Sequence, residues 1–190
     1  MRPVDHHIRS TVSESLKVRI DWIGEDGFDF DEPLQAAWLD RTLGSDSPYR
    51  ADGDGRLTLH LMRAEQVVHV RGRVLVSLKA ECVRCLGPAP LALDLPIEVA
   101  LFPRGEEPEA AIDGEVANED LGVSSYDEEE IDFASLVHDE VFLELPMNPV
   151  CTEKCAGLCP QCGTNLNEGR CSCVSEIDPR WQGLRGIKVD

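Results

Sequence analysis

Cysteines are the residues of this sequence whose type and spacing best fit a chemical role. Six of the eight lie between residues 151 and 173, and the other two lie about seventy residues upstream. A structural zinc ion takes four deprotonated thiolates in a tetrahedron, so eight cysteines match two zinc sites. The candidate ligands form an upstream pair (Cys82, Cys85), a root pair (Cys151, Cys155), a knuckle pair (Cys159, Cys162) and an end pair (Cys171, Cys173).

The spacing favours one particular division of these pairs between two sites. The knuckle pair encloses two residues and precedes Gly163, and the end pair follows after an eight-residue loop, so these four thiols favour one local site. The root pair and the upstream pair are then left to form the other. In the alternative, the root pair joins the knuckle pair or the end pair and the upstream pair is metal-free. Two zinc ions are favoured, and one is possible.

The same residues argue against an enzyme. A catalytic zinc keeps a position open for water and commonly uses histidine or carboxylate ligands, whereas all five histidines lie outside the cysteine cluster. A thiol redox site requires a lowered thiol pKa, as at a helix N-terminus, but the upstream pair stands between strand-like segments. The cysteine spacings also match none of the common ferredoxin patterns. We expect structural metal and no catalytic or cofactor-binding residue.

The elements that position these pairs follow from the apolar pattern. Alternation predicts strands near 14–22, 56–62, 66–79 and 91–102, which places the upstream pair in the turn between the last two. Apolar residues at helical spacing predict helices over 31–43, capped by Asp31, and from Asp132 to Pro146; Asp178 is a candidate start for another. The expected fold is α+β, an antiparallel meander sheet packed by one or two helices with a Cys-rich zinc-knuckle module at the C-terminus.

Charge divides the chain at about residue 150. The formal net charge is -18, and residues 1–150 carry 31 acidic against 13 basic residues, whereas residues 151–190 carry five of each. We therefore expect an acidic α+β body over 1–150 and a Cys-rich zinc-binding tail over 151–190. Within the body, residues 104–131 are strongly acidic and poor in apolar side chains, which predicts a mobile loop. The body would repel nucleic-acid phosphates and attract basic proteins.

The sequence also bears on location. The first residues contain no apolar run of the length found in secretory signals, and no stretch approaches the roughly 18 apolar residues of a membrane span. These observations predict a cytoplasmic protein with no membrane partner. In a reducing cytoplasm, clustered cysteines favour metal binding over disulfides.

Several short segments, taken in order, resemble one known family. They are Glu81-Cys82-Val-Arg-Cys85, Ile131-Asp132-Phe133, Asp139-Glu140-Val141, Leu143-Glu-Leu145-Pro146, Gly157-Leu-Cys159-Pro-Gln-Cys162-Gly-Thr-Asn-Leu-Asn167 and Ile177-Asp178-Pro179-Arg180. Together they resemble the YceD family, the large ribosomal RNA subunit accumulation proteins, over roughly residues 15–185. The N-terminal 44 residues match weakly.

The resemblance implies a non-enzymatic factor for biogenesis of the bacterial large ribosomal subunit, which supports accumulation of its RNA. The implied partner is a ribosomal protein or a large-subunit assembly factor, with ribosomal RNA a possible contact of the tail and no small-molecule substrate. Two alternatives stay open: a zinc-ribbon module that binds nucleic acid, and a thiol redox switch that uses Cys82 and Cys85.

Overall fold

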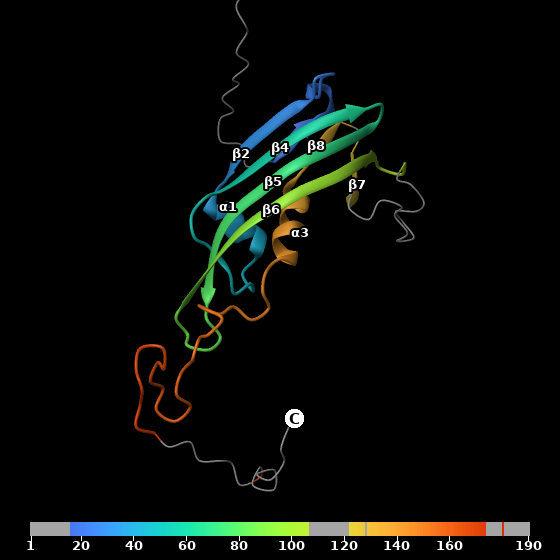
Figure 1. The fold of residues 1–190 in the computed structure, drawn as a ribbon. Coiled ribbons are helices and arrows are strands. Elements are labelled where there is room, and N and C mark those ends of the chain that lie inside the picture. The colour runs from blue at the N-terminus through green and yellow to red at the C-terminus, as the bar shows by residue number, and fades with distance from the viewer. Residues whose placement is uncertain (1–15, 107–121, 128, 174–179, 181–190) are drawn as a thin grey trace, which may run out of the picture.

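The computed structural model describes residues 16–106, 122–127, 129–173 and 180. Its helices and strands, in chain order, are β1 (Lys17–Arg19), a 3-10 turn (Ile20–Trp22), β2 (Phe28–Leu34), α1 (Ala36–Leu43), β3 (Arg50–Ala51), β4 (Gly55–Ala64), β5 (Val67–Glu81), β6 (Pro88–Pro103), β7 (Gly122–Tyr126), β8 (Glu130–Asp132) and α3 (Ala134–Leu143). Figure 1 shows these elements from the N-terminus in blue to the C-terminal segment in red.

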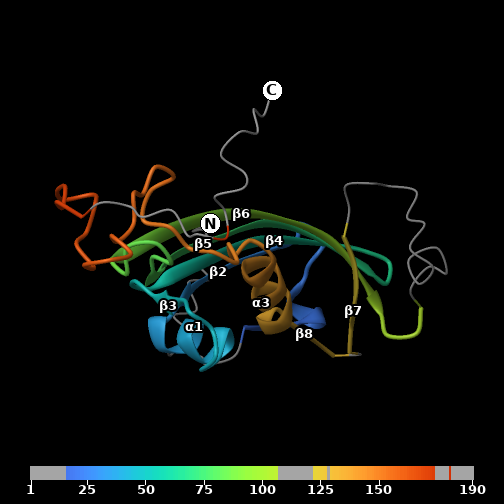
Figure 2. The same ribbon diagram turned by 90° about the horizontal axis from the view of Figure 1, so that it is seen from below.

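The main sheet has the strand order β2-β4-β5-β6-β7, and the short β3 pairs with β5 at one end. From β2 through β4 and β5 to β6, each strand runs antiparallel to the next, whereas the edge strand β7 runs parallel to β6. Both helices lie on the same face of the sheet (Figure 2). The expected α+β class with a mostly antiparallel sheet is confirmed, with the parallel edge strand β7 as a difference from a simple meander.

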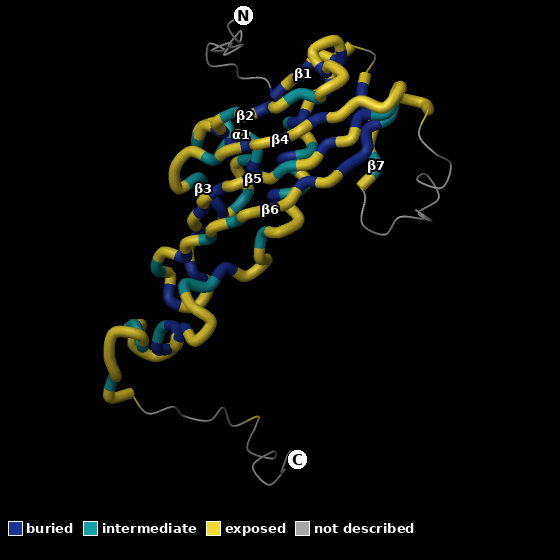
Figure 3. Tube along the Cα trace, turned by 45° about the horizontal axis from the view of Figure 1, so that its top comes forward, coloured by how far each residue is buried: buried dark blue, intermediate teal, exposed yellow. Residues whose placement is uncertain are grey.

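Alternating side chains build the core between the sheet and the helices. Buried residues alternate with exposed ones over most of β4 and β5 (Figure 3). Phe133, fully buried at the start of α3, packs near Phe30 of β2 with the ring centroids 5.9 Å apart. Full burial of such a side chain contributes about 1.5–3 kcal/mol, so this packing stabilises the body.

The predicted helix over 31–43 was wrong in its first part. Residues up to Leu34 belong to the edge strand β2, which pairs with β4, and the helix begins at Ala36. Asp31 therefore does not cap it; its carboxylate accepts a 2.7 Å hydrogen bond from Arg56 across the strands. The Ala36 N–H instead donates to the Asp54 carboxylate at 2.8 Å. Pairing between distant strands has overridden the local helical pattern.

The acidic segment over about 104–131, most of which was expected to be a mobile loop, contains two strands in its second part. Residues 107–121 lie outside the described residues, but Gly122–Tyr126 form β7 and Glu130–Asp132 form β8. Tyr126 is buried and donates its hydroxyl to the carbonyl of Gln66 at 2.7 Å. Ile131 is buried where β8 pairs with β1. Burial of Tyr126 and Ile131 thus holds the described second part of this stretch against the body.

The remaining predicted elements agree with the structure in kind and differ at their ends. The three strands over 56–62, 66–79 and 91–102 are the cores of β4, β5 and β6. The strand near 14–22 is only Lys17–Arg19, followed by a 3-10 turn. The helix after Asp132 is confirmed as α3, and it ends at Leu143, before Pro146. The helix start at Asp178 lies outside the described residues.

Candidate metal centre

The upstream pair lies at the end of the long β5–β6 hairpin. The hairpin turn is closed by hydrogen bonds from Cys82 N–H to the Gly87 carbonyl at 2.8 Å and from Leu86 N–H to the Cys82 carbonyl at 2.9 Å. After α3 the chain returns to this turn, where Val83 N–H donates to the Pro149 carbonyl at 2.9 Å. This contact brings the root pair, which begins two residues further on at Cys151, close to the upstream pair.

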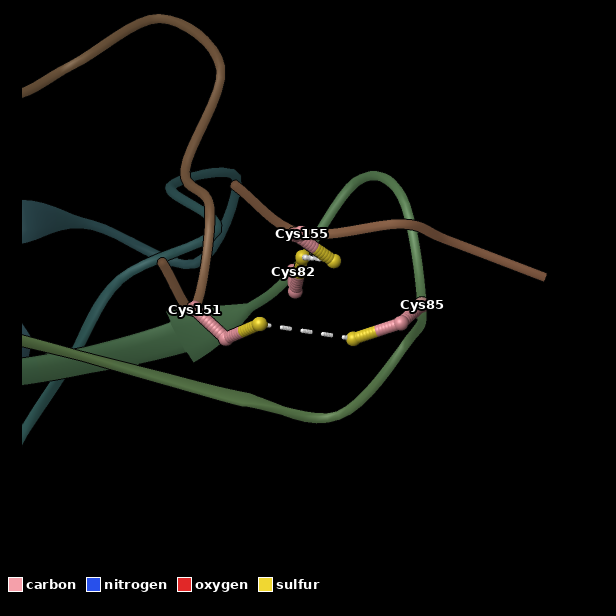
Figure 4. Close-up of side chains that lie close together, drawn as sticks. All are labelled: Cys82, Cys85, Cys151 and Cys155. Atoms are coloured by element: carbon pink, nitrogen blue, oxygen red, sulfur yellow. Dashed lines mark hydrogen bonds between the residues drawn. The ribbon is translucent and has the colours of Figure 1, made fainter. Parts of the chain in front are cut away.

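The two pairs form a first cluster of four thiols (Figure 4). The sulfur atoms are 3.8 Å apart between Cys82 and Cys155 and 3.6 Å apart between Cys85 and Cys151, and all four lie within 4.8 Å of one another. Four sulfurs bound at about 2.3 Å to one tetrahedral metal would be about 3.8 Å apart. Three of the four side chains are buried and Cys151 is half-buried. The cluster therefore has the size and the ligand type of a closed thiolate site.

Neighbouring groups hold the root pair against the hairpin. The Arg84 guanidinium donates to the backbone carbonyls of Glu153 and Cys155 at 3.1 and 3.2 Å, and the Arg84 carbonyl accepts from Leu158 N–H at 3.0 Å. Gly157 crosses this point with φ of +75°, and a Cβ there would lie 3.1 Å from the Arg84 carbonyl oxygen. A side chain at position 157 would thus be disfavoured by both the backbone angle and the close contact.

The knuckle pair and the end pair form a second cluster, whose sulfurs also lie within 4.8 Å of one another. The knuckle turn is closed by Gly163 N–H, which donates to the Cys159 carbonyl at 2.9 Å, and Gly163 has φ of +72°. Cys159 is buried, but Cys162 and Cys173 are exposed. The second cluster is therefore much more open to solvent than the first.

The loop between the knuckle pair and the end pair contacts the first cluster through an asparagine side chain. The Asn167 side chain accepts from Ala156 N–H at 2.8 Å and donates to the Cys155 sulfur at 3.3 Å. The Asn165 side chain accepts from Asn167 N–H at 3.0 Å, which fixes the position of that residue. Hydrogen bonds to ligand atoms orient them and stabilise the charged form. The sequence indicated only a turn here, and the contact between Asn167 and the sulfur was missed.

The surroundings give the thiols of each cluster different pKa values. Burial raises the pKa of Cys82, but backbone groups of Cys151, Cys85 and Arg84 outweigh it and lower the pKa to about 6. The Thr164 hydroxyl, with its sulfur–oxygen distance of 3.1 Å, is the main cause that lowers the pKa of Cys162 to about 6. Each cluster thus contains a thiol whose pKa is lowered toward neutral pH.

Other thiols of the clusters hold their protons more tightly. The neighbouring Cys162 sulfur is the main group that raises the pKa of Cys173 to about 12. For Cys85, the Gly87 backbone lowers the pKa, but burial and the nearby thiols prevail and raise it to about 12. A thiolate thus discourages ionisation of its neighbours, and a bound cation would remove this penalty.

All eight predicted site residues come together in two groups of four that could hold a metal ion. The grouping is the favoured one, in which the upstream pair meets the root pair. Within the described residues, no histidine, aspartate or glutamate joins either group. The part of the chain that the structure describes also contains no helix that is long and apolar enough to cross a membrane.

Fold and clusters together define a class: a small α+β protein whose hairpin end and C-terminal segment share one four-thiol cluster, with a second four-thiol cluster inside the C-terminal segment. The chain belongs to the YceD family, because the family model described as "Large ribosomal RNA subunit accumulation protein YceD" matches residues 70–188. The match begins within β5 and includes all eight cysteines. No solved structure matches the chain.

Individual relatives are found in bacteria and plants. An uncharacterized protein of Mycobacterium bovis is 36% identical over 128 residues, which cover 67% of this chain and 59% of the relative. One from Mycobacterium leprae is 33% identical over 128 residues, with 67% and 56% covered. A maize protein named "Large ribosomal RNA subunit accumulation protein YCED homolog 1, chloroplastic" is 27% identical over 153 residues, with 69% and 52% covered. The chain thus spans less than two thirds of these relatives' length.

Proposed function

We propose that this protein is a non-enzymatic factor for biogenesis of the large ribosomal subunit, which supports accumulation of the large-subunit ribosomal RNA. The observation that carries the proposal is membership of the YceD family over residues 70–188. The charge distribution supports a protein partner, since a body with 31 acidic and 13 basic residues attracts basic ribosomal proteins or assembly factors. We assign contact with ribosomal RNA to the near-neutral tail. We also place the protein in the cytoplasm.

The proposal includes two structural zinc ions, one in each cluster. Thiolate ligands suit zinc, and sulfur separations of 3.6 and 3.8 Å in the first cluster agree with a tetrahedral site. A zinc ion there would stabilise four negative thiolates and tie the root of the C-terminal segment to the β5–β6 hairpin. Since all four positions would be taken by sulfur, the ion supplies folding free energy and not a reactive water.

The same geometry favours a structural role over a redox switch. The Cys82 and Cys85 sulfurs each face a partner from the root pair, at 3.8 and 3.6 Å, and the pair stands at a strand turn and not at a helix N-terminus. A bound metal would occupy both thiols and keep them from exchange. We therefore place the upstream pair in the zinc site.

We also propose the boundary between the acidic body and the tail at residues 150 and 151. The first cluster spans this boundary, because the upstream pair belongs to the body and the root pair to the tail. The zinc ion in that cluster would then be the joint between the two parts.

The function is tested by deleting the gene and measuring the ratio of large-subunit to small-subunit ribosomal RNA. We expect the ratio to fall in the deletion strain and to recover when the wild-type gene, but not an empty vector, is supplied. A normal ratio, together with a normal profile of free subunits and ribosomes on a sucrose gradient, would contradict the proposal.

A further inference from the structure

Large apolar side chains are exposed in the turn that carries the upstream pair and around the end of α3, from which the chain returns to that turn. Eight such side chains are exposed among the described residues, and five of them lie in the hairpin turn or just at and after the end of α3. We call these five the joint surface: Val83, Leu86, Phe142, Leu143 and Met147. Leu143 and Met147 are 81% and 94% exposed, which is unusual for side chains of this size.

The two stretches of the joint surface are connected through the backbone. Val83 N–H donates to the Pro149 carbonyl at 2.9 Å, and Met147 is only two residues before Pro149. Since a residue spans at most about 3.6 Å, Met147 lies within roughly 10 Å of the hairpin turn. Met147 and the exposed side chains of the turn therefore lie in one region, and Leu143 and Phe142 precede Met147 by four and five residues along the chain.

Leu86 gives independent support for a contact in this region. It follows the upstream pair as Gly163 follows the knuckle pair, and each donates its N–H to the carbonyl of the first cysteine at 2.9 Å. Both have left-handed backbone, with φ of 59° for Leu86 and 72° for Gly163. Glycine adopts this angle freely, whereas a residue with a Cβ is strained. Leu86 is nevertheless 57% exposed and outside both core clusters, so the fold gains little from its side chain.

The end of α3 carries three acidic side chains, of which Asp139 contacts a ring nitrogen of His138 at 2.8 Å. Asp139, Glu140 and Glu144 lie in or next to its last turns, and that end has no basic residue. Burial raises the pKa of Glu140, and the charges of Asp139 and Glu144 add to the effect. The C-terminal end of a helix carries partial negative charge and favours cations, so carboxylates there are destabilising. Cations from a partner would relieve this repulsion.

The aromatic ring of Phe142 is already held in place at this surface. It stacks on His138, with the ring centroids 5.5 Å apart and the planes 16° from parallel. A rigid exposed ring loses little conformational entropy when it is covered, which is a property of side chains that dominate interfaces.

We propose that the joint surface docks a basic polypeptide segment, which places apolar side chains over Leu86, Leu143 and Met147 and Lys or Arg beside the acids of α3. The inference rests on the proposed function, in which the partner is a basic ribosomal protein or assembly factor. Charge selects this occupant over others. A second copy of the chain also carries -18, and RNA phosphates would be repelled by the same carboxylates.

Site-specific photo-cross-linking tests the surface. The benzophenone amino acid would replace Met147 in one strain and Met62, an exposed methionine of β4 on the uncovered face of the sheet, in a control strain. We expect irradiation to join position 147 to a protein with more Lys and Arg than Asp and Glu, and position 62 not to capture it. No adduct at position 147, an adduct with RNA or with a second copy, or equal capture at both positions would overturn the proposal.

The captured protein is then purified and its affinity measured against the full chain. We expect Leu143→Asp and Met147→Asp each to weaken binding at least tenfold, and Met62→Asp to leave it unchanged, with equal melting temperatures for all three variants. Leu86→Gly, which keeps the backbone angle, should also weaken binding. Unchanged affinity in the first two variants would contradict the proposal. A deletion strain with normal ribosomal RNA would contradict only the proposed function, because the cross-linking result is read separately.

Discussion

At the scale of single residues, the groups around the sulfurs would decide how well each cluster holds a metal ion. Asn167 reaches the first cluster from the loop of the second, with its side-chain nitrogen 3.3 Å from the Cys155 sulfur. Arg84 holds the backbone of the root pair by two hydrogen bonds. These contacts orient the thiols, so they would contribute to the affinity for a metal ion without touching it.

Replacing Asn167 by alanine should weaken metal binding at the first cluster. The change removes the bond to the sulfur and the bond from Ala156 N–H, and loss of such a group typically costs about 10–100-fold in affinity. Competition with a coloured zinc chelator measures the effect. Asn148→Ala, at an exposed asparagine before the root pair, is the control and should bind like the wild type. Equal retention of zinc by both variants would contradict the role given to Asn167.

At the scale of the elements, β5 is the central strand of the main sheet. It pairs with β4 and β6 and carries the upstream pair just beyond its end. Gly72 lies in the middle of β5, where a Cβ would overlap the Thr58 carbonyl oxygen and come within 2.8 Å of the Leu59 Cα. Only glycine allows the two strands to approach in this way.

Gly72→Ala should therefore destabilise the body. Overlap with backbone atoms costs about 1–3 kcal/mol, because the neighbouring strand must shift. Gly122→Ala in β7 is a matched control, since the nearest atom to a Cβ there is 3.6 Å away. Denaturant unfolding compares the two free energies of unfolding. A similar change in both variants would show that β4 and β5 are not as close as described.

The elements also show how far the sequence could lead. Alternation of Leu57, Leu59 and Leu61 predicted β4, because it needs no information from elsewhere in the chain. The boundary between β2 and α1 was missed, because the strand depends on pairing with β4 and the helix cap on Asp54, 18 residues away. Strand β7 was also missed. It depends on the hydrogen bond from Tyr126 to the distant Gln66, and the acidic composition around Tyr126 predicted a loop instead.

The candidate site was predictable in part for the same reason. The spacing of the knuckle pair and the end pair indicated a local group of four thiols. The meeting of the upstream pair with the root pair depends on the chain's return from α3 to the hairpin, through contacts such as Val83 with Pro149. The spacing of the cysteines favoured that arrangement but did not exclude the alternative grouping of the pairs. The contact between Asn167 and the Cys155 sulfur could not be predicted, because the sequence there indicated only a turn.

At the scale of the whole molecule, the two clusters differ in position and exposure, and we expect them to have different structural roles. The first is largely buried at the end of the sheet, whereas the second, with Cys162 and Cys173 exposed, lies in the segment that extends beyond the sheet (Figure 1). The first would hold the C-terminal segment to the body, and the second would shape that segment. This arrangement predicts that the two metal ions differ in how easily they are lost.

A chelator should remove metal from the second cluster first. Exposed sulfurs allow a competing ligand to approach, so native mass spectra should pass from two zinc ions through a persistent state with one. Alkylation followed by peptide mapping should then label the knuckle and end pairs before the upstream and root pairs. Simultaneous loss of both ions, or the reverse order of labelling, would contradict the difference in exposure.

The central claim is that the upstream pair completes a metal site with the root pair and so joins the body to the C-terminal segment. Native mass spectrometry with metal quantification tests it on the wild type and on the Cys82→Ser/Cys85→Ser variant. We predict two zinc ions per chain in the wild type and one in the variant, retained by the second cluster. An unchanged count in the variant, or a wild type that binds no zinc, would contradict the account.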